Sequence, residues 1–145
     1  RSSRAAIPVI RRTFGQETVA LELATEQFYH LDTCFCPLAG GKVLYYPPAF
    51  TPEGLATIRA RVPESQRIEA SAEEAAAFCV NAVNLGARIV MAKAPESLRR
   101  TLRGRGYSLT EVDLSPFILS GGASYCMTLR LDRTSVPAAQ LHAAE

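Results

Sequence analysis

The chain has 145 residues, of which 48% are hydrophobic and 21% charged, close to the average of a globular protein. Its 16 Lys and Arg residues are interspersed with 14 Asp and Glu residues, so the charge does not form the basic surface of a nucleic-acid-binding protein. No apolar run approaches the roughly 20 residues that a membrane-spanning helix needs. We therefore expect a cytoplasmic protein with neither a nucleic-acid nor a membrane partner.

The ends of the chain differ from its middle. It starts with the polar sequence RSSR rather than with Met, which indicates a processed or truncated piece of a longer protein. The length predicts one domain. Residues 133–145 are rich in alanine, and we expect an irregular, frayed tail there.

The first part of the chain predicts a β-hairpin. A short amphipathic segment over residues 5–15 comes before a strand over residues 18–23, where apolar and polar side chains alternate. Two more strands, over residues 28–38 and 42–46, flank a glycine turn. Strands separated in this way pair as a hairpin.

Helices and strands alternate in the rest of the chain. Thr51 is a helix N-cap followed by proline, and a short strand covers residues 66–69. Ser71 opens a capping box for a second helix.

Residues 87–92 and 107–112 then read as strands on either side of a helix over residues 94–103. The chain is therefore of the α/β class. Mixed units of about 40 to 50 residues suggest a repeat around an axis.

The cysteines are Cys34, Cys36, Cys79 and Cys126. One residue separates the first two, which fits neither a zinc or thioredoxin motif nor a disulfide framework. We interpret them as buried small side chains or reactive thiols, and we predict no metal site and no cofactor.

The segment Ser120–Leu131 holds the candidate nucleophile. Gly121 and Gly122 form a flexible turn, Cys126 follows, and an alternating run up to Leu131 predicts a strand. A cysteine attacks only as the thiolate, which needs a base, a cation or hydrogen-bond donors nearby. The alternative is a buried core thiol.

His30 is the candidate base, because the other histidine, His142, lies in the tail. Two residues separate His30 from Asp32, so both would point to the same side of the predicted strand. A carboxylate beside Cys126 would hinder thiolate formation unless it binds a cationic substrate, and a planar guanidinium matches a carboxylate through paired hydrogen bonds. A surface imidazole near a carboxylate is the alternative for this pair.

Four motifs together resemble the C-terminal half of the guanidino-group-modifying enzymes. These motifs are FYHLDTCF at Phe28–Phe35, YYPPAF at Tyr45–Phe50, NAVNLG at Asn81–Gly86 and SGGASYCMT at Ser120–Thr128. The family includes amidinotransferases, arginine deiminases and dimethylarginine dimethylaminohydrolases, and has the pentein fold. The resemblance implies a partial five-bladed α/β propeller of ββαβ-like units, with residues 1–132 as its C-terminal part.

The resemblance also implies roles for individual residues. Cys126 would be the nucleophile, His30 the general acid and base, and Asp32 the ligand of the guanidinium, while Gly121 and Gly122 would let the backbone approach the substrate. The implied enzyme hydrolyses an arginine-like guanidino group through an amidino group bound to the cysteine. An amine acceptor in place of water would make it an amidinotransferase.

Two further expectations accompany the resemblance. We interpret Asn81 and Asn84 as residues that make turn hydrogen bonds beside the channel. The enzymes of the family are longer, so a missing N-terminal half, a partner chain or a second copy is expected to complete the fold and to supply an acidic partner for His30. The alternative function is a catalytically silent pentein used for binding or assembly.

Overall fold

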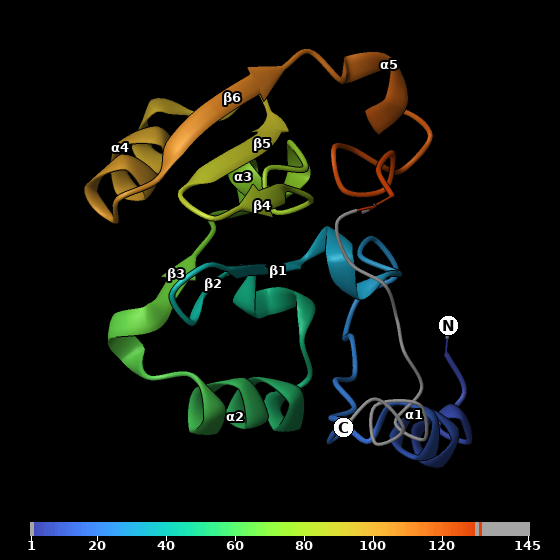
Figure 1. Ribbon diagram of the computed structural model, residues 1–145. Coiled ribbons are helices and arrows are strands. Elements are labelled where there is room, and N and C mark those ends of the chain that lie inside the picture. The colour runs from blue at the N-terminus through green and yellow to red at the C-terminus, as the bar shows by residue number, and fades with distance from the viewer. Residues whose placement is uncertain (1, 130, 132–145) are drawn as a thin grey trace. The chain divides into compact units, whose positions relative to one another are not determined.

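The structure, a computed structural model, describes residues 2–129 and 131 (Figure 1). The chain divides into two compact units, one formed by Glu22–Thr128 and one that includes Arg1–Leu21. Helix α1 (Ala6–Phe14) belongs to the latter and corresponds to the predicted amphipathic segment. None of the helices in the described part of the chain is long and apolar enough to cross a membrane. The predicted tail over residues 133–145 lies outside the described residues.

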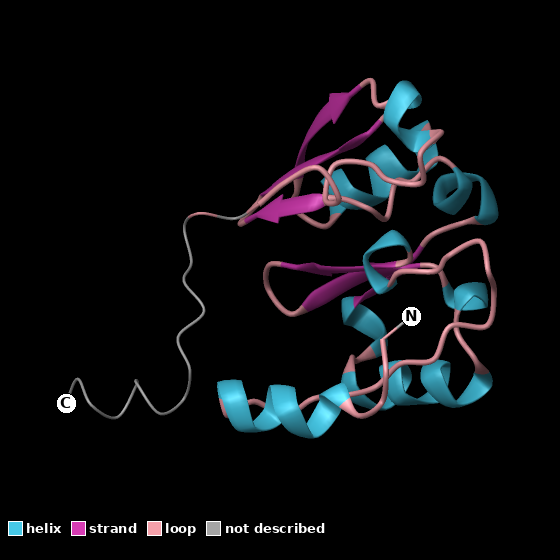
Figure 2. Ribbon diagram, turned by 90° about the vertical axis from the view of Figure 1, so that its right-hand side faces the viewer, coloured by secondary structure: helices cyan, strands magenta, loops and turns pink. Residues whose placement is uncertain are grey.

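The Glu22–Thr128 unit contains two three-stranded sheets with helices packed on them (Figure 2). Its helices and strands are, in chain order, β1 (Phe35–Leu38), β2 (Lys42–Tyr45), α2 (Pro52–Arg61), β3 (Arg67–Glu69), α3 (Ala72–Ala76), β4 (Val83–Leu85), β5 (Arg88–Ala92), α4 (Glu96–Gly104), β6 (Ser108–Val112) and α5 (Ser115–Ile118).

The two sheets have the same topology. In the first, β1 pairs antiparallel with β2, and β2 pairs parallel with β3. In the second, β4, β5 and β6 repeat this order. Helices α2 and α4 make the crossovers that parallel strands require. The predicted ββαβ units are therefore confirmed, whereas the sheets of the described residues do not close into a ring, and the five-bladed propeller stays a prediction.

The local signals act as the sequence suggested. Gly40 and Gly41 adopt positive φ angles of 79° and 76° at the tip of the first hairpin, a conformation that favours glycine. Thr51 Oγ1 accepts the N–H of Gly54 at 3.2 Å and caps α2. Ser71 opens α3 with a complete capping box.

Two predicted strands are wrong or too long. Residues 18–23 form no strand, and only an isolated bridge joins Leu23 to Phe50. The strand expected over residues 28–38 is limited to β1, because Leu31–Thr33 forms a 3-10 turn. Alternation alone does not make a strand where no neighbouring strand offers backbone partners.

One hydrophobic core joins the two sheets. Leu44 of β2, Ile89 of β5 and Leu102 of α4 belong to the same buried cluster. The thiol of Cys36 donates a hydrogen bond to the carbonyl of Ala82 at 3.4 Å and thereby connects β1 with the segment before β4. The two ββαβ units consequently share one packed interior.

Three of the four cysteines are buried, and two of them, Cys36 and Cys79, belong to this core. Burial raises the pKa of Cys34 and of Cys79 to about 12 and that of Cys36 to about 11. These thiols stay protonated at neutral pH, which matches the interpretation as small buried side chains.

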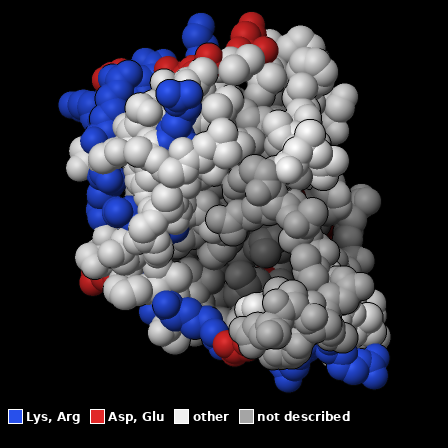
Figure 3. Space-filling model, viewed as in Figure 1, with Lys and Arg blue, Asp and Glu red and all other residues white. Residues whose placement is uncertain are grey.

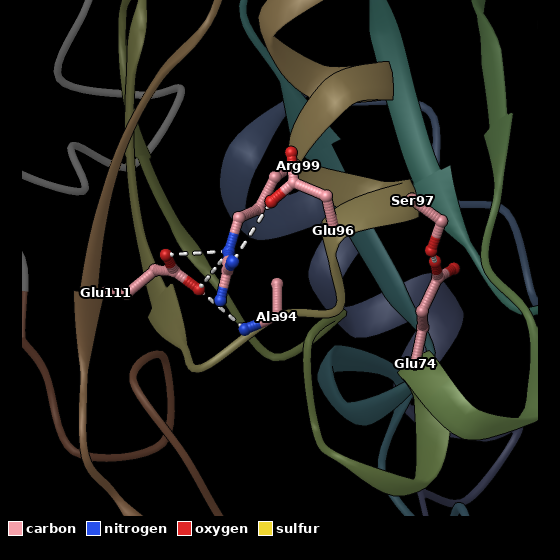
Figure 4. Close-up of polar contacts among 6 residues, drawn as sticks. All are labelled: Glu74, Ala94, Glu96, Ser97, Arg99 and Glu111. Carbon is pink, nitrogen blue, oxygen red and sulfur yellow. Dashed lines mark hydrogen bonds and ion pairs between the residues drawn. The ribbon is translucent and has the colours of Figure 1, made fainter.

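Polar contacts fix helix α4 against its surroundings (Figure 4). Glu111 of β6 accepts the backbone N–H of Ala94 at 2.6 Å and pairs with Arg99 of α4 at 3.0 Å. Ser97 donates to the buried Glu74 of α3 at 2.8 Å. Although burial raises the pKa of Glu111, the Ala94 N–H and the Arg99 guanidinium outweigh it and hold the pKa below its usual value.

Candidate active site

Three segments far apart in the sequence meet at the candidate site. Asp32 lies in the 3-10 turn directly before β1, and Asn81 lies directly before β4. Cys126 lies in a turn that follows α5. Because β1 and β4 open units of the same topology, equivalent points of the two units supply Asp32 and Asn81.

The sulfur of Cys126 has two polar neighbours. Its Sγ atom lies 3.0 Å from Oδ2 of Asp32 and 3.2 Å from Nδ2 of Asn81. Partial burial of the sulfur and the hydrogen bond with the Asp32 carboxylate raise the pKa of Cys126, whereas the N–H donated by Asn81 lowers it. In this arrangement the thiol donates to the carboxylate, which favours the protonated form of the cysteine. The alternative of a buried core thiol is excluded, because Cys126 is exposed.

His30 is not joined to this cluster. Its side chain is exposed, and its ring contacts Tyr29 edge-on with 4.7 Å between the ring centroids. The structure records no hydrogen bond from the imidazole to Asp32 or Cys126 among the described residues. His30 lies just outside the 3-10 turn that contains Asp32, so the expectation that both lie on one face of a strand is wrong.

The glycine pair brings the backbone close to neighbouring side chains. Gly121 has a φ angle of 85°, and its carbonyl accepts the hydroxyl of Tyr29 at 3.2 Å. A side chain at Gly121 would collide with that hydroxyl. At Gly122, a Cβ atom would lie 3.0 Å from Cβ of Cys126. Both glycines therefore give Tyr29 and Cys126 the space that they occupy.

The strand predicted after Cys126 is not formed. Residues 124–127 are in turns, and Thr128, Leu129 and Leu131 have no regular structure, while residue 130 lies outside the described residues. In the described part of the chain no other strand pairs with this segment.

Asn81 is the site residue that the sequence interpretation missed. Its side chain is fully buried and makes hydrogen bonds to Asp32 and Cys126, so the interpretation of it as a turn residue is incomplete. Asn84 does make turn contacts, since it donates to the carbonyls of Gly86 and Arg88. The two asparagines of one motif thus differ in their roles, and no local signal distinguishes them, because the partners of Asn81 are 49 and 45 residues away.

A surface hollow of about 570 Å³ lies elsewhere, lined by Arg59, Glu64, Arg67, Glu69 and Arg105. None of these is a predicted site residue, and this set of Arg and Glu side chains contains no cysteine, serine or histidine that could act as a nucleophile. In the view of Figure 3, several Lys and Arg side chains gather at the upper left. No group of three or more His, Cys, Asp or Glu side chains within residues 2–129 could hold a metal ion. The Cys126 cluster is therefore the candidate active site.

Comparison with known proteins connects this geometry to an enzyme family. No protein-family model matches the chain. The bifunctional arginine dihydrolase/ornithine cyclodeaminase ArgZ of Synechocystis sp. is 41% identical over 137 residues, which cover 94% of this chain and 19% of ArgZ. The N(G),N(G)-dimethylarginine dimethylaminohydrolase of Mycobacterium tuberculosis is 34% identical over 90% of this chain and 43% of that enzyme.

The fold agrees with these sequence relationships. The substrate-bound N-terminal domain of ArgZ, in a cysteine-to-serine variant, superposes with a TM-score of 0.88 and 41% identity. The chain is homologous to guanidino-group-modifying enzymes of the pentein superfamily. The superposition covers 90% of this chain but only 48% of the ArgZ domain. The chain therefore corresponds to about half of that domain.

Proposed function

We propose that this chain carries part of the active site of an enzyme that hydrolyses the guanidino group of an arginine-like substrate. The observation that carries the proposal is the contact between Cys126 Sγ and Asp32 Oδ2 at 3.0 Å. It joins a nucleophile to a carboxylate that suits a guanidinium. Two relatives, an arginine dihydrolase and a dimethylarginine dimethylaminohydrolase, support hydrolysis rather than amidino transfer.

The reaction proceeds in two steps. Asp32 accepts hydrogen bonds from the guanidinium, His30 takes the proton of the Cys126 thiol, and the resulting thiolate attacks the central carbon of the guanidinium. His30 protonates the departing amine, the C–N bond breaks, and an amidino group stays on the sulfur. His30 then takes a proton from water, which adds to the same carbon and expels the thiolate, giving a ureido product. A structure of the ArgZ N-terminal domain covalently bound to a reaction intermediate supports a covalent route.

We infer that residues 1–132 form the C-terminal part of the domain and that further protein completes the site. The hydroxyl of Ser124, two residues before the nucleophile, is buried and has no hydrogen-bond partner among the described residues. Such a group normally finds one. Leu119 is 90% exposed beside this segment, which is apolar surface that a missing half of the propeller, a partner chain or a second copy would cover.

The test uses the full-length protein with L-arginine as substrate. Cys126→Ser keeps the size of the side chain and removes the thiolate, so ureido product and ammonia are expected to fall by at least about 10³-fold. The matched control is Cys36→Ser, the same exchange at a buried thiol that contacts no site residue, and it is expected to retain turnover. Equal turnover in Cys126→Ser and in the unchanged protein would refute the proposal.

A further inference from the structure

The carboxamide of Asn81 has an orientation that its neighbours determine. Its Oδ1 atom accepts the backbone N–H of Ala123 at 2.9 Å and that of Cys126 at 3.3 Å. Its Nδ2 atom faces the carbonyl oxygen of Asp32 at 3.0 Å and the carboxylate at 3.1 Å. Backbone N–H groups only donate and these oxygens only accept, so the reversed amide would place donors against donors and acceptors against acceptors.

The amide nitrogen serves more acceptors than it has hydrogens. Two N–H bonds face three acceptors, namely the two Asp32 oxygens and, at 3.2 Å, the sulfur of Cys126. The carboxylate and the sulfur therefore share one donor. If a cation bound the Asp32 carboxylate, the shared N–H of Asn81 would be free to donate to a Cys126 thiolate.

We propose that Asn81 is the positioning residue of the active site, which fixes the nucleophile turn to the Asp32 segment and directs an N–H at the sulfur of Cys126. The expected effect on kcat rests on the proposed function, whereas the hydrogen-bond geometry of Asn81 does not depend on it. Asn81 is completely buried, and no other described residue makes side-chain hydrogen bonds to both Asp32 and Cys126.

The side-chain type is specific to this task. Aspartate would keep the acceptor for the N–H groups of Ala123 and Cys126 but would place a second oxygen against the sulfur and the Asp32 oxygens. Alanine would remove donor and acceptor together. Asparagine supplies an acceptor on one side and a donor on the other, within one short and buried side chain.

The first experiment measures how fast iodoacetamide alkylates Cys126 as a function of pH in the full-length protein. Asn81→Asp is expected to raise the midpoint by about one pH unit, because a donor to the sulfur is lost and a negative charge is added. Asn81→Ala is expected to raise the alkylation midpoint by less, and it replaces Asn81→Asp as the test variant if Asn81→Asp does not fold. The titratable groups near Cys126 are few. Asp32 contacts the sulfur, and His30 and Tyr29 belong to the same segment as Asp32. On the Asn81 segment, Cys79 is buried and stays neutral.

Asn84→Asp is the matched control. It makes the same exchange three positions away, in a side chain that bonds Gly86, Arg88 and Ala39 but no site residue, so the alkylation midpoint is expected to stay unchanged. A folded Asn81→Asp protein, as judged by circular dichroism, with an unchanged midpoint would overturn the inference.

A second measurement separates the inference from the proposed function. If the protein hydrolyses arginine, kcat of Asn81→Asp is expected to fall by roughly 10²-fold, as for a nucleophile that is slightly misplaced, and kcat of Asn84→Asp is not. Absence of hydrolysis in the unchanged protein would refute the function, while the alkylation midpoints would still decide the role of Asn81. Equal kcat values for the two variants would overturn the role itself.

Discussion

The sulfur of Cys126 lies 3.0 Å from a carboxylate oxygen of Asp32, although 94 residues separate them in the sequence. The carboxylate helps to raise the pKa of the thiol, which favours its protonated form. A guanidinium bound to Asp32 would neutralise this charge and free the thiol. In the proposed mechanism a guanidinium and the Cys126 thiol would therefore compete for one carboxylate.

Asp32→Asn is expected to make Cys126 more reactive and the enzyme less active. Loss of the negative charge lowers the pKa of Cys126, so the midpoint of its alkylation should move to lower pH by about one unit. The KM for arginine should rise by at least about 10-fold, because a charge-assisted pair with the guanidinium is lost. Alkylation profiles and initial rates measure the two effects, and slower alkylation of Asp32→Asn at pH 7 would contradict the arrangement.

Labelling with a charged probe is expected to be selective for Cys126. Cys34 and Cys79, with pKa values of about 12, and Cys36, at about 11, are buried, and they should react only after unfolding. Chloroacetamidine carries a cation for Asp32, whereas chloroacetamide is neutral and of similar size. Mass spectrometry should therefore find faster labelling of Cys126 by the amidine, and equal rates for both probes would argue for a binding or assembly module.

Gly121→Ala is expected to destabilise the protein more than Gly86→Ala. Both positions have positive φ angles, 85° and 62°, so each exchange strains the backbone by about 1 kcal/mol. At Gly86 the new methyl group meets open space, whereas at Gly121 it meets the hydroxyl of Tyr29. Urea unfolding should show a total loss of roughly 2–3 kcal/mol for Gly121→Ala.

Removal of the Tyr29 hydroxyl provides the control for this prediction. In the double variant Gly121→Ala, Tyr29→Phe, the collision disappears and part of the lost stability should return. Identical losses for Gly121→Ala and Gly86→Ala would show that the contact with Tyr29 has no energetic weight.

Glu111→Gln is expected to reduce stability at neutral pH and to flatten its dependence on acid. The folded-state pKa of Glu111 is lowered, so its contribution is present above the unfolded-state pKa and is lost as the pH falls through the folded-state pKa. The amide keeps an acceptor for Ala94 but loses the charge that pairs with Arg99, a difference of about 1 kcal/mol. Unfolding measured between pH 3 and pH 7, roughly the range in which a carboxylate titrates, should converge for both proteins at the acid end.

Local signals in the sequence were sufficient for most of the secondary structure. The capping box at Ser71, the N-cap Thr51 and the glycines of the first hairpin each act within a few residues, and the structure contains all of them. The resemblance to guanidino-modifying enzymes was also correct, because it rested on four motifs rather than on periodicity. Signals of this kind do not depend on distant parts of the chain.

The errors arise where structure depends on distant partners. Alternation after Cys126 predicted a strand, yet a strand needs a neighbour with free backbone groups, and the described residues provide none there. Asn81 was assigned to turn bonds because its true partners, Asp32 and Cys126, are 49 and 45 residues away. The link between His30 and Cys126 stays a prediction for the same reason.

In each sheet the first strand runs from the candidate site to an exposed hairpin tip. Asp32 and Asn81 lie where the first strand of each unit begins, and the exposed hairpin tips Gly40-Gly41 and Gly86 lie where that strand has ended. The paired strands separate these tips from the site. A short tag inserted at either tip would thus lie at the end of the sheet away from Asp32 and Asn81.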